Sequence, residues 1–161
     1  MIKEVLQSQY DKCFHIFRDT IKNYDKEIWF DEKNYRTPAW QITYHAIFYA
    51  NIYCSPTEKD IIHWQKEREH YHDFKKMHEY RKNGEVIEPY SISDMEEYLE
   101  FLKDKVPMYL DKIKPEERCW PFWYDESQHE FHINNLRHIQ HHLGEIIERH
   151  DIKKEFKYNW K

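Results

Sequence analysis

Three histidines lie close together in the stretch LRHIQHHLGEI, which runs from Leu136 to Ile146. His138 and His142 are four residues apart, so on a helix their Cβ atoms lie ~6 Å apart on adjacent turns. At that spacing two imidazole nitrogens can bind one metal ion at ~2.0 to 2.1 Å. Such a pair also arises by chance in a chain with twelve histidines, so a metal site requires a third ligand from another element.

The helical periodicity of this stretch separates its histidines. At ~100° per residue, His138 and His142 border the apolar stripe of the helix. The stripe consists of Leu136, Ile139, Leu143 and Ile146. His141 falls on the solvent face, beside Arg137. We therefore predict that His138 and His142 are metal ligands and that His141 is a surface residue.

His45 is the candidate for the third ligand. It lies in WQITYHAIFYAN, the most apolar segment of the chain, where an imidazole without a partner costs ~1 to 3 kcal/mol of desolvation. A backbone carbonyl or a tyrosine hydroxyl could satisfy it, and so could a metal ion. Three neutral imidazoles would leave an open coordination position, which is typical of catalytic zinc.

Glu145 follows His142 by one helical turn. It could act as a general base, accept a hydrogen bond from an imidazole N–H, or lie in solvent as a plain surface carboxylate. Zinc proteases with the H-E-x-x-H motif place their base directly after the first histidine. Here that residue is Ile139, so Glu145 is the catalytic candidate that remains.

The elements that must position these residues are predicted to be helices. Apolar residues recur every three to four positions, and with only two glycines the chain has few of the turns that a β-sandwich or barrel needs. Thr37 and Pro38 resemble a helix start, as do the capping boxes Ser93–Glu96 and Ser127–Glu130. The predicted helices cover Ile2 to about Asn23, Pro38 to Cys54, the Ser93 cap to about Ile113, and the Ser127 cap to about His150. This pattern predicts an all-α four-helix bundle, in a single domain over residues 1–161.

A charged segment separates the second and third predicted helices. Residues 58–90 are dense in Lys, Arg, Asp and Glu and contain few apolar residues. We predict that this segment either extends the second helix or forms a solvated helical insertion that ends near Asn83 and Gly84.

Composition excludes several classes of function. The net charge of −5, with both signs interspersed, gives no basic surface for nucleic acid. Three cysteines without CxxC spacing are typical of a reducing compartment. No apolar run reaches the ~20 residues of a membrane span, and the first residues do not resemble a secretion signal. We expect a cytoplasmic protein that acts on a small molecule, without a membrane or nucleic-acid partner.

The loop CWPFWY, residues 119–124, is rich in aromatic side chains. It could pack on the end of the bundle, line the mouth of a pocket, or meet a second subunit. A homodimer is therefore one of the alternatives that the sequence leaves open.

Two segments carry a resemblance to a known family. TPAWQI, residues 37–42, is followed by His45, and LRHIQHHLGE covers residues 136–145. In motif placement and helix order, most of the chain resembles the DinB-like (DinB/YfiT) family of metalloenzymes. The resemblance implies a four-helix bundle in which His45, His138 and His142 hold a divalent metal, often zinc or nickel.

The same resemblance implies a class of reaction. Some DinB-like proteins are S-transferases that use bacillithiol, mycothiol or glutathione, and others are maleylpyruvate isomerases or are described as hydrolases. We therefore expect a metal-dependent S-transferase with a low-molecular-weight thiol as cosubstrate and a small electrophile as substrate. The alternatives are a hydrolase that uses metal-bound hydroxide and a non-catalytic protein that binds a metal or ligand. The segment from Glu58 to Glu88 is longer than the family's usual helix connection.

Overall fold

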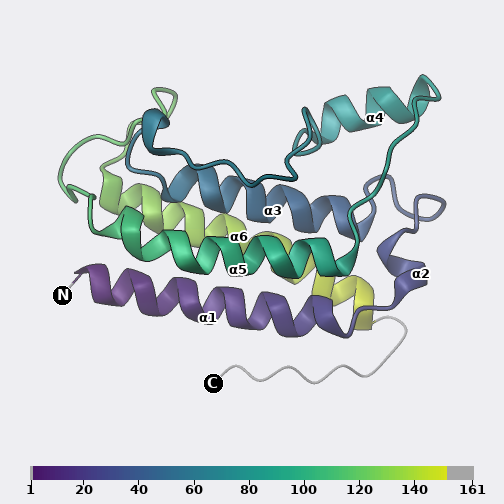
Figure 1. Ribbon diagram of the computed structural model, residues 1–161, viewed down its shortest axis with the longest axis horizontal. Coiled ribbons are helices and arrows are strands. Elements are labelled where there is room, and N and C mark those ends of the chain that lie inside the picture. Colours follow the sequence, from purple (N-terminus) through teal and green to yellow (C-terminus); the bar gives the residue numbers. More distant parts are fainter. Residues whose placement is uncertain (1, 152–161) are drawn as a thin grey trace.

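The computed structural model describes residues 2–151, and the polypeptide there is helical with connecting loops (Figure 1). The helices are α1 (Ile2–Lys22), α2 (Lys26–Trp29), α3 (Ala39–Cys54), the short 3₁₀ helix η1 (Glu58–Asp60), α4 (Phe74–Lys82), α5 (Ile92–Leu110) and α6 (Gln128–Asp151). Within these residues the only β-pairing is one isolated bridge between Arg118 and Ser127. The prediction of an all-α protein is confirmed. The predicted single domain, residues 1–161, extends beyond the described residues at both ends.

The four long helices pack against one another. α3 contacts α5 and α6, and α1 contacts the same two helices from the other side. Figure 1 shows the four lying side by side, with α2 and α4 outside them. In the described residues no helix is both long enough and apolar enough to cross a membrane.

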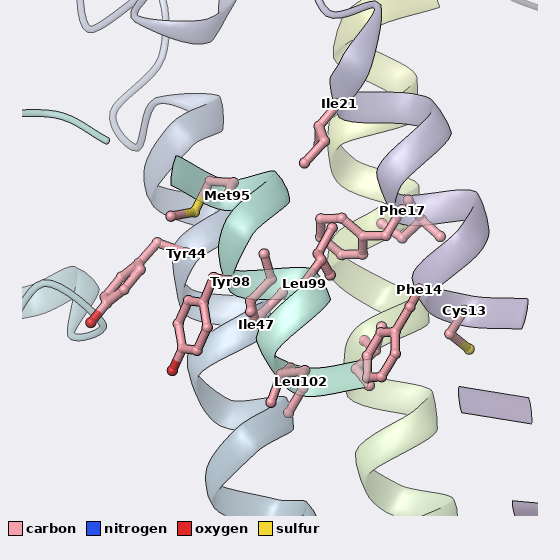
Figure 2. Close-up of a cluster of buried hydrophobic side chains, with 14 of the residues drawn as sticks. Cys13, Phe14, Phe17, Ile21, Tyr44, Ile47, Met95, Tyr98, Leu99 and Leu102 are labelled. Atoms are coloured by element: carbon pink, nitrogen blue, oxygen red, sulfur yellow. The ribbon is translucent and has the colours of Figure 1, made fainter. Parts of the chain in front are cut away.

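Aromatic side chains are the largest residues in the interior of this bundle. Figure 2 shows Phe14 and Phe17 of α1 reaching toward Leu99 of α5, with Ile47 of α3 nearby. Fully burying one such side chain stabilises the fold by ~1.5 to 3 kcal/mol. Trp29 is also fully buried, and its indole N–H donates to the carbonyl of Tyr90 at 3.0 Å. The Trp29 ring therefore brings its polar atom into the core together with a hydrogen-bond partner.

The start of α3 differs slightly from the prediction. Pro38 is the N-cap, with extended backbone and no side-chain cap hydrogen bond, and the helix begins at Ala39. Thr37 therefore does not cap the helix. The residue before a proline is pushed toward extended conformations, and the carbonyl of Thr37 instead accepts a hydrogen bond from the Arg149 guanidinium at 2.7 Å.

The start of α5 lies two residues earlier than predicted. The sequence offers two overlapping capping boxes, and the structure uses Ser91 with Asp94 in place of Ser93 with Glu96. The Ser91 hydroxyl accepts from the Asp94 N–H at 3.1 Å, and Asp94 accepts from the Ser91 N–H at 3.0 Å. Lys66 also pairs with Asp94 at 2.9 Å. A contact from a distant segment therefore reinforces the first of the two boxes.

The start of α6 agrees with the prediction, whereas the end of α5 does not. At the start of α6, Ser127 accepts from the Glu130 N–H at 3.3 Å and Glu130 accepts from the Ser127 N–H at 2.9 Å. The second predicted capping box is confirmed. α5 ends at Leu110, before the expected Ile113, and contains Pro107.

Replacing Ser91 with alanine should lower the free energy of unfolding by about 1 kcal/mol, because the N-cap hydrogen bond is lost. Ser93 is exposed, so the Ser93→Ala change should stay within about 0.5 kcal/mol of the wild type. Urea denaturation of both variants measures the difference. A larger loss for Ser93→Ala would mean that the helix begins at the second box.

The inserted segment, residues 58–90, is neither an extension of α3 nor fully solvated. α3 ends at Cys54, and the chain passes through η1 and several turns before α4. Trp64 and Met77 of this segment are buried in the main core cluster. The Trp64 ring stacks on Tyr98 with centroids 4.4 Å apart. The predicted helical insertion is present and ends near Gly84, but it is solvated only in part, because these few apolar residues reach the bundle.

Candidate metal centre

The candidate ligands lie where α3 and α6 pack together. Tyr53 of α3 contacts Phe131 of α6, with ring centroids 4.9 Å apart. Earlier on α3, His45 contacts His142 of α6 at 4.7 Å. The two helices therefore run in opposite directions. This arrangement brings His45 to the same level as the histidine pair on α6, although 93 residues separate it from His138.

The Nε2 atoms of the three histidines converge. Nε2 of His138 lies 3.3 Å from Nε2 of His45 and 3.2 Å from Nε2 of His142. One ligand atom from each residue lies within 4.8 Å of the others. Two nitrogens bound tetrahedrally to one ion at ~2.05 Å are ~3.3 Å apart. The spacing therefore fits a single divalent metal ion.

Hydrogen bonds on the far side of two rings determine where their protons lie. Nδ1 of His45 is 2.7 Å from the carbonyl oxygen of His72. Nδ1 of His142 is 2.6 Å from Oε2 of Glu145. A carbonyl and a carboxylate only accept hydrogen bonds, so both Nδ1 atoms carry a proton. In the neutral rings, Nε2 of His45 and Nε2 of His142 then hold lone pairs that face the cluster.

The proton count favours a cation at this point. A neutral His138 carries one proton, on either Nε2 or Nδ1. If the proton is on Nε2, it can donate well to only one of the two neighbouring atoms, Nε2 of His45 or Nε2 of His142. On Nδ1 that proton would have no acceptor, since Nδ1 of His138 is buried and has no hydrogen-bond partner in the structure described over residues 2–151. Lone pairs therefore face one another in either tautomer. A divalent cation would bind all three, so the residues present fit a metal.

The electrostatics of the cluster also suit metal binding. Burial lowers the pKa of His45 to about 3 and that of His138 to about 4, because the imidazolium ion is poorly solvated there. Positive charge on neighbouring imidazoles contributes to both of these lowered values. Both rings are therefore neutral at pH 7, which is the form that binds metals.

Glu145 has one of the three roles predicted for it, because its carboxylate accepts a hydrogen bond from the His142 imidazole. Its hydrogen bond with His142 lowers the pKa of the Glu145 carboxyl group, and this contact is the one that orients and polarises a ligating imidazole. The suggested role of Glu145 as a general base stays a prediction.

His141 is exposed, as predicted, and its Nε2 lies 4.0 Å from Oε2 of Glu145. His141, His142 and Glu145 form a second group whose atoms are close enough to hold an ion. That group would need Nδ1 of His142, which already donates to Glu145. The group of His45, His138 and His142, which is buried or partly buried at every position, is therefore the better candidate.

Two features of the site were not predicted from the sequence, and both come from the inserted segment. One is the His72 carbonyl. The other is Phe74, whose ring stacks on His45 with centroids 4.1 Å apart and meets the edge of His142 at 6.0 Å. An isolated Phe in a charged segment was an available signal for a buried contact. A backbone carbonyl carries no such signal.

Tyrosine rings form another side of the site. Tyr49 contacts His45 at 4.8 Å and His138 at 5.6 Å. Tyr53 contacts His138 at 6.0 Å and leads to the aromatic loop, because its ring also meets Tyr124. The three ligands are thus surrounded by aromatic surface on α3 as well as by Phe74.

The aromatic loop packs on the end of the bundle, as one of the three alternatives predicted. The Trp120 indole donates to the carbonyl of Ser55 at 2.9 Å, and Tyr124 joins a small buried cluster with Phe131. Phe122 and Trp123 are 81% and 58% exposed. A second subunit at this loop stays an expectation.

Three histidines from two helices thus form a group that could hold a metal ion in an all-helical protein. The spacing of the three Nε2 atoms and the chemistry of the imidazole donors support the site. No model of a known protein family, no curated protein and no solved structure matches the chain.

Proposed function

We propose that this protein is a metal-dependent enzyme that activates a low-molecular-weight thiol for attack on a small electrophile. The observation that carries the proposal is the convergence of three Nε2 atoms, with 3.2 and 3.3 Å between neighbours. Three protein ligands are typical of catalytic zinc sites, whereas structural sites have four. A zinc or nickel ion held there would lower the pKa of a bound water or thiol.

The residues around the ligands would prepare the site. His72 and Glu145 hold His45 and His142 with the proton on Nδ1, which directs both Nε2 atoms at the metal position. Phe74 contacts both of these imidazoles, and Tyr49 contacts that of His45. Aromatic surface at this place limits the access of water and offers contact area for the apolar part of a substrate.

The choice of a thiol as cosubstrate rests on the resemblance of residues 37–45 and 136–145 to DinB-like proteins, and is an inference by analogy. One observation weighs against hydrolysis with Glu145 as the general base. The Glu145 carboxylate accepts a hydrogen bond from His142 and its pKa is lowered, so it is a weak base. A metal-bound thiol would not need this base, because it loses its proton to solvent.

Thiol transfer is the direct test. Protein made without a histidine tag and loaded with zinc or nickel should couple at least one of glutathione, bacillithiol and mycothiol to an aryl halide. The expected result is thioether formation faster than in the uncatalysed mixture, with the excess rate abolished by a chelator. The measurement is the disappearance of free thiol together with identification of the thioether by mass.

A matched control is the His138→Ala variant, which removes one proposed ligand and should show only the uncatalysed rate. Stoichiometric metal without coupling of any thiol would refute the transferase. In that case release of product from ester and amide substrates would distinguish a hydrolase from a protein that only binds its metal.

A further inference from the structure

The turn at residues 70–74, in the inserted segment, contacts His45 in two ways. The His72 carbonyl accepts the His45 Nδ1 proton at 2.7 Å. The Phe74 ring stacks on the same imidazole, with 23° between the planes. One contact fixes which nitrogen carries the proton, and the other restricts the plane of the ring. Both come from outside the bundle.

The backbone of this turn is unusual. His70 has φ 63, and between residues 2 and 151 it is the only residue other than glycine with a positive φ. The Tyr71 N–H donates to the carbonyl of Arg68 at 3.3 Å, so His70 is the third residue of a β-turn, where a positive φ is typical of type II. Such a conformation is unfavourable for a residue with a Cβ and persists where the surrounding structure requires it.

Contacts on both sides of His72 hold the turn. The His72 ring stacks on Phe48 at 4.1 Å with only 5° between the planes. The Asp73 N–H donates to the carbonyl of His70 at 2.9 Å, and the Asp73 carboxylate caps α4 by accepting from the N–H groups of Lys75 and Lys76. The His72 carbonyl is therefore held between a fixed side chain and the start of a helix.

We propose that the 70–74 turn is a positioning element of the metal centre. The left-handed backbone at His70 directs the His72 carbonyl at His45, and this hydrogen bond holds Nε2 of His45 toward the other two imidazoles before any metal binds. The inference rests on the proposed metal site and is independent of the thiol reaction. Loss of an outer hydrogen-bond partner of a ligating histidine typically lowers metal affinity by roughly 10- to 100-fold.

Substitutions at His70 test this role, because the carbonyl itself cannot be replaced. His70→Val opposes a positive φ, whereas His70→Asn tolerates it. Gly84→Val is the matched control. Gly84 also has a positive φ, 72, at the other end of α4, and a Cβ added there meets nothing within 4 Å. The Gly84→Val substitution therefore strains the backbone of the same inserted segment at a residue that does not contact His45.

Two measurements on the full chain are needed. The first is a long-range proton–nitrogen NMR spectrum of the metal-free protein, in which His45 should be protonated on Nδ1 alone. The second is Co²⁺ affinity, measured by competition with a chelator. His70→Asn and Gly84→Val should match the wild type in both. His70→Val should mix the two tautomers of His45 and bind Co²⁺ about 10-fold more weakly, or worse.

Each outcome decides something. Unchanged tautomer and affinity in His70→Val overturn the positioning role, and so does an equal loss in Gly84→Val, which would reflect general loosening of the segment. If the wild type binds no Co²⁺, the metal site and the positioning role that rests on it both fail, and mixed tautomers in His70→Val would show only that the turn orients His45. Should the valine variant not fold, His70→Ala replaces it, with a smaller change expected in the same direction.

Discussion

Replacing His142 with alanine is expected to remove stoichiometric metal from the protein. His142 supplies one of three converging Nε2 atoms and lies 3.2 Å from the next. Two imidazoles on an otherwise solvated ion bind far more weakly than three. Since loss of an outer partner alone lowers affinity by roughly 10- to 100-fold, loss of a ligand should lower it by more than ~100-fold. Elemental analysis of desalted protein made without a histidine tag measures the effect.

The same loss is expected for His45→Ala and His138→Ala. His141→Ala is the control, because this exposed side chain lies on the same helix as His142 but outside the buried cluster. The metal affinity of Glu145→Gln should lie between those of the ligand variants and of His141→Ala, roughly 10-fold below the wild type. If His141→Ala loses its metal while His45→Ala keeps it, the ion binds the second group, formed by His141, His142 and Glu145.

The metal-free protein is expected to lose stability as the pH falls from about 6.5 to about 4. Burial lowers the folded-state pKa of His45 to about 3 and that of His138 to about 4. It also lowers to about 4 the pKa of His132, which is buried on α6 beside the Tyr10 hydroxyl. In the unfolded chain these groups return to ~6.5. Below that pH the unfolded state binds protons that the folded state does not, so acid favours unfolding. The stability that these groups provide is complete above about pH 6.5 and falls as the pH approaches the folded values.

The slope of this dependence can be bounded. One fully shifted group changes the free energy of unfolding by ~1.4 kcal/mol per pH unit. Because His138 is partly solvated, we expect about 2 to 3 kcal/mol per unit for the three groups together between roughly pH 6 and 4.5. Urea denaturation in the presence of a chelator measures it. His45→Gln should reduce the slope, and the exposed His141→Gln should not. Stability that stays flat from pH 7 to 5 would contradict the burial of these rings.

Helix positions could largely be predicted from the sequence, since they depend on neighbours within one or two turns. The apolar periodicity of residues 2–22 and the capping box at Ser127 are local features. The start of α5 was missed because two capping boxes overlap there. The box that the structure uses contains Asp94, which also pairs with Lys66 of the inserted segment. The local preference for a helix start does not by itself distinguish the Ser91–Asp94 box from the Ser93–Glu96 box.

The candidate ligands could also be identified from the sequence. The spacing of His138 and His142 is a helical relation, and His45 is a polar residue in an apolar segment, so each carries its own signal. Their convergence follows from the antiparallel packing of α3 and α6, which the short distance between His45 and His138 reflects. The same helical periodicity, at ~100° per residue, placed His141 on the solvent face.

The sequence by itself thus determined where the four long helices lie, and that His45, His138 and His142 face inward whereas His141 does not, because periodicity and burial are encoded residue by residue. Only the tertiary structure decided how the site is held. The acceptor of the His45 proton is a backbone carbonyl 27 residues away, and Phe74 reaches the same ring from a segment that its composition marked as solvated. Every residue has a carbonyl, so residue type cannot indicate which one a buried imidazole meets. The path of the chain determines that contact.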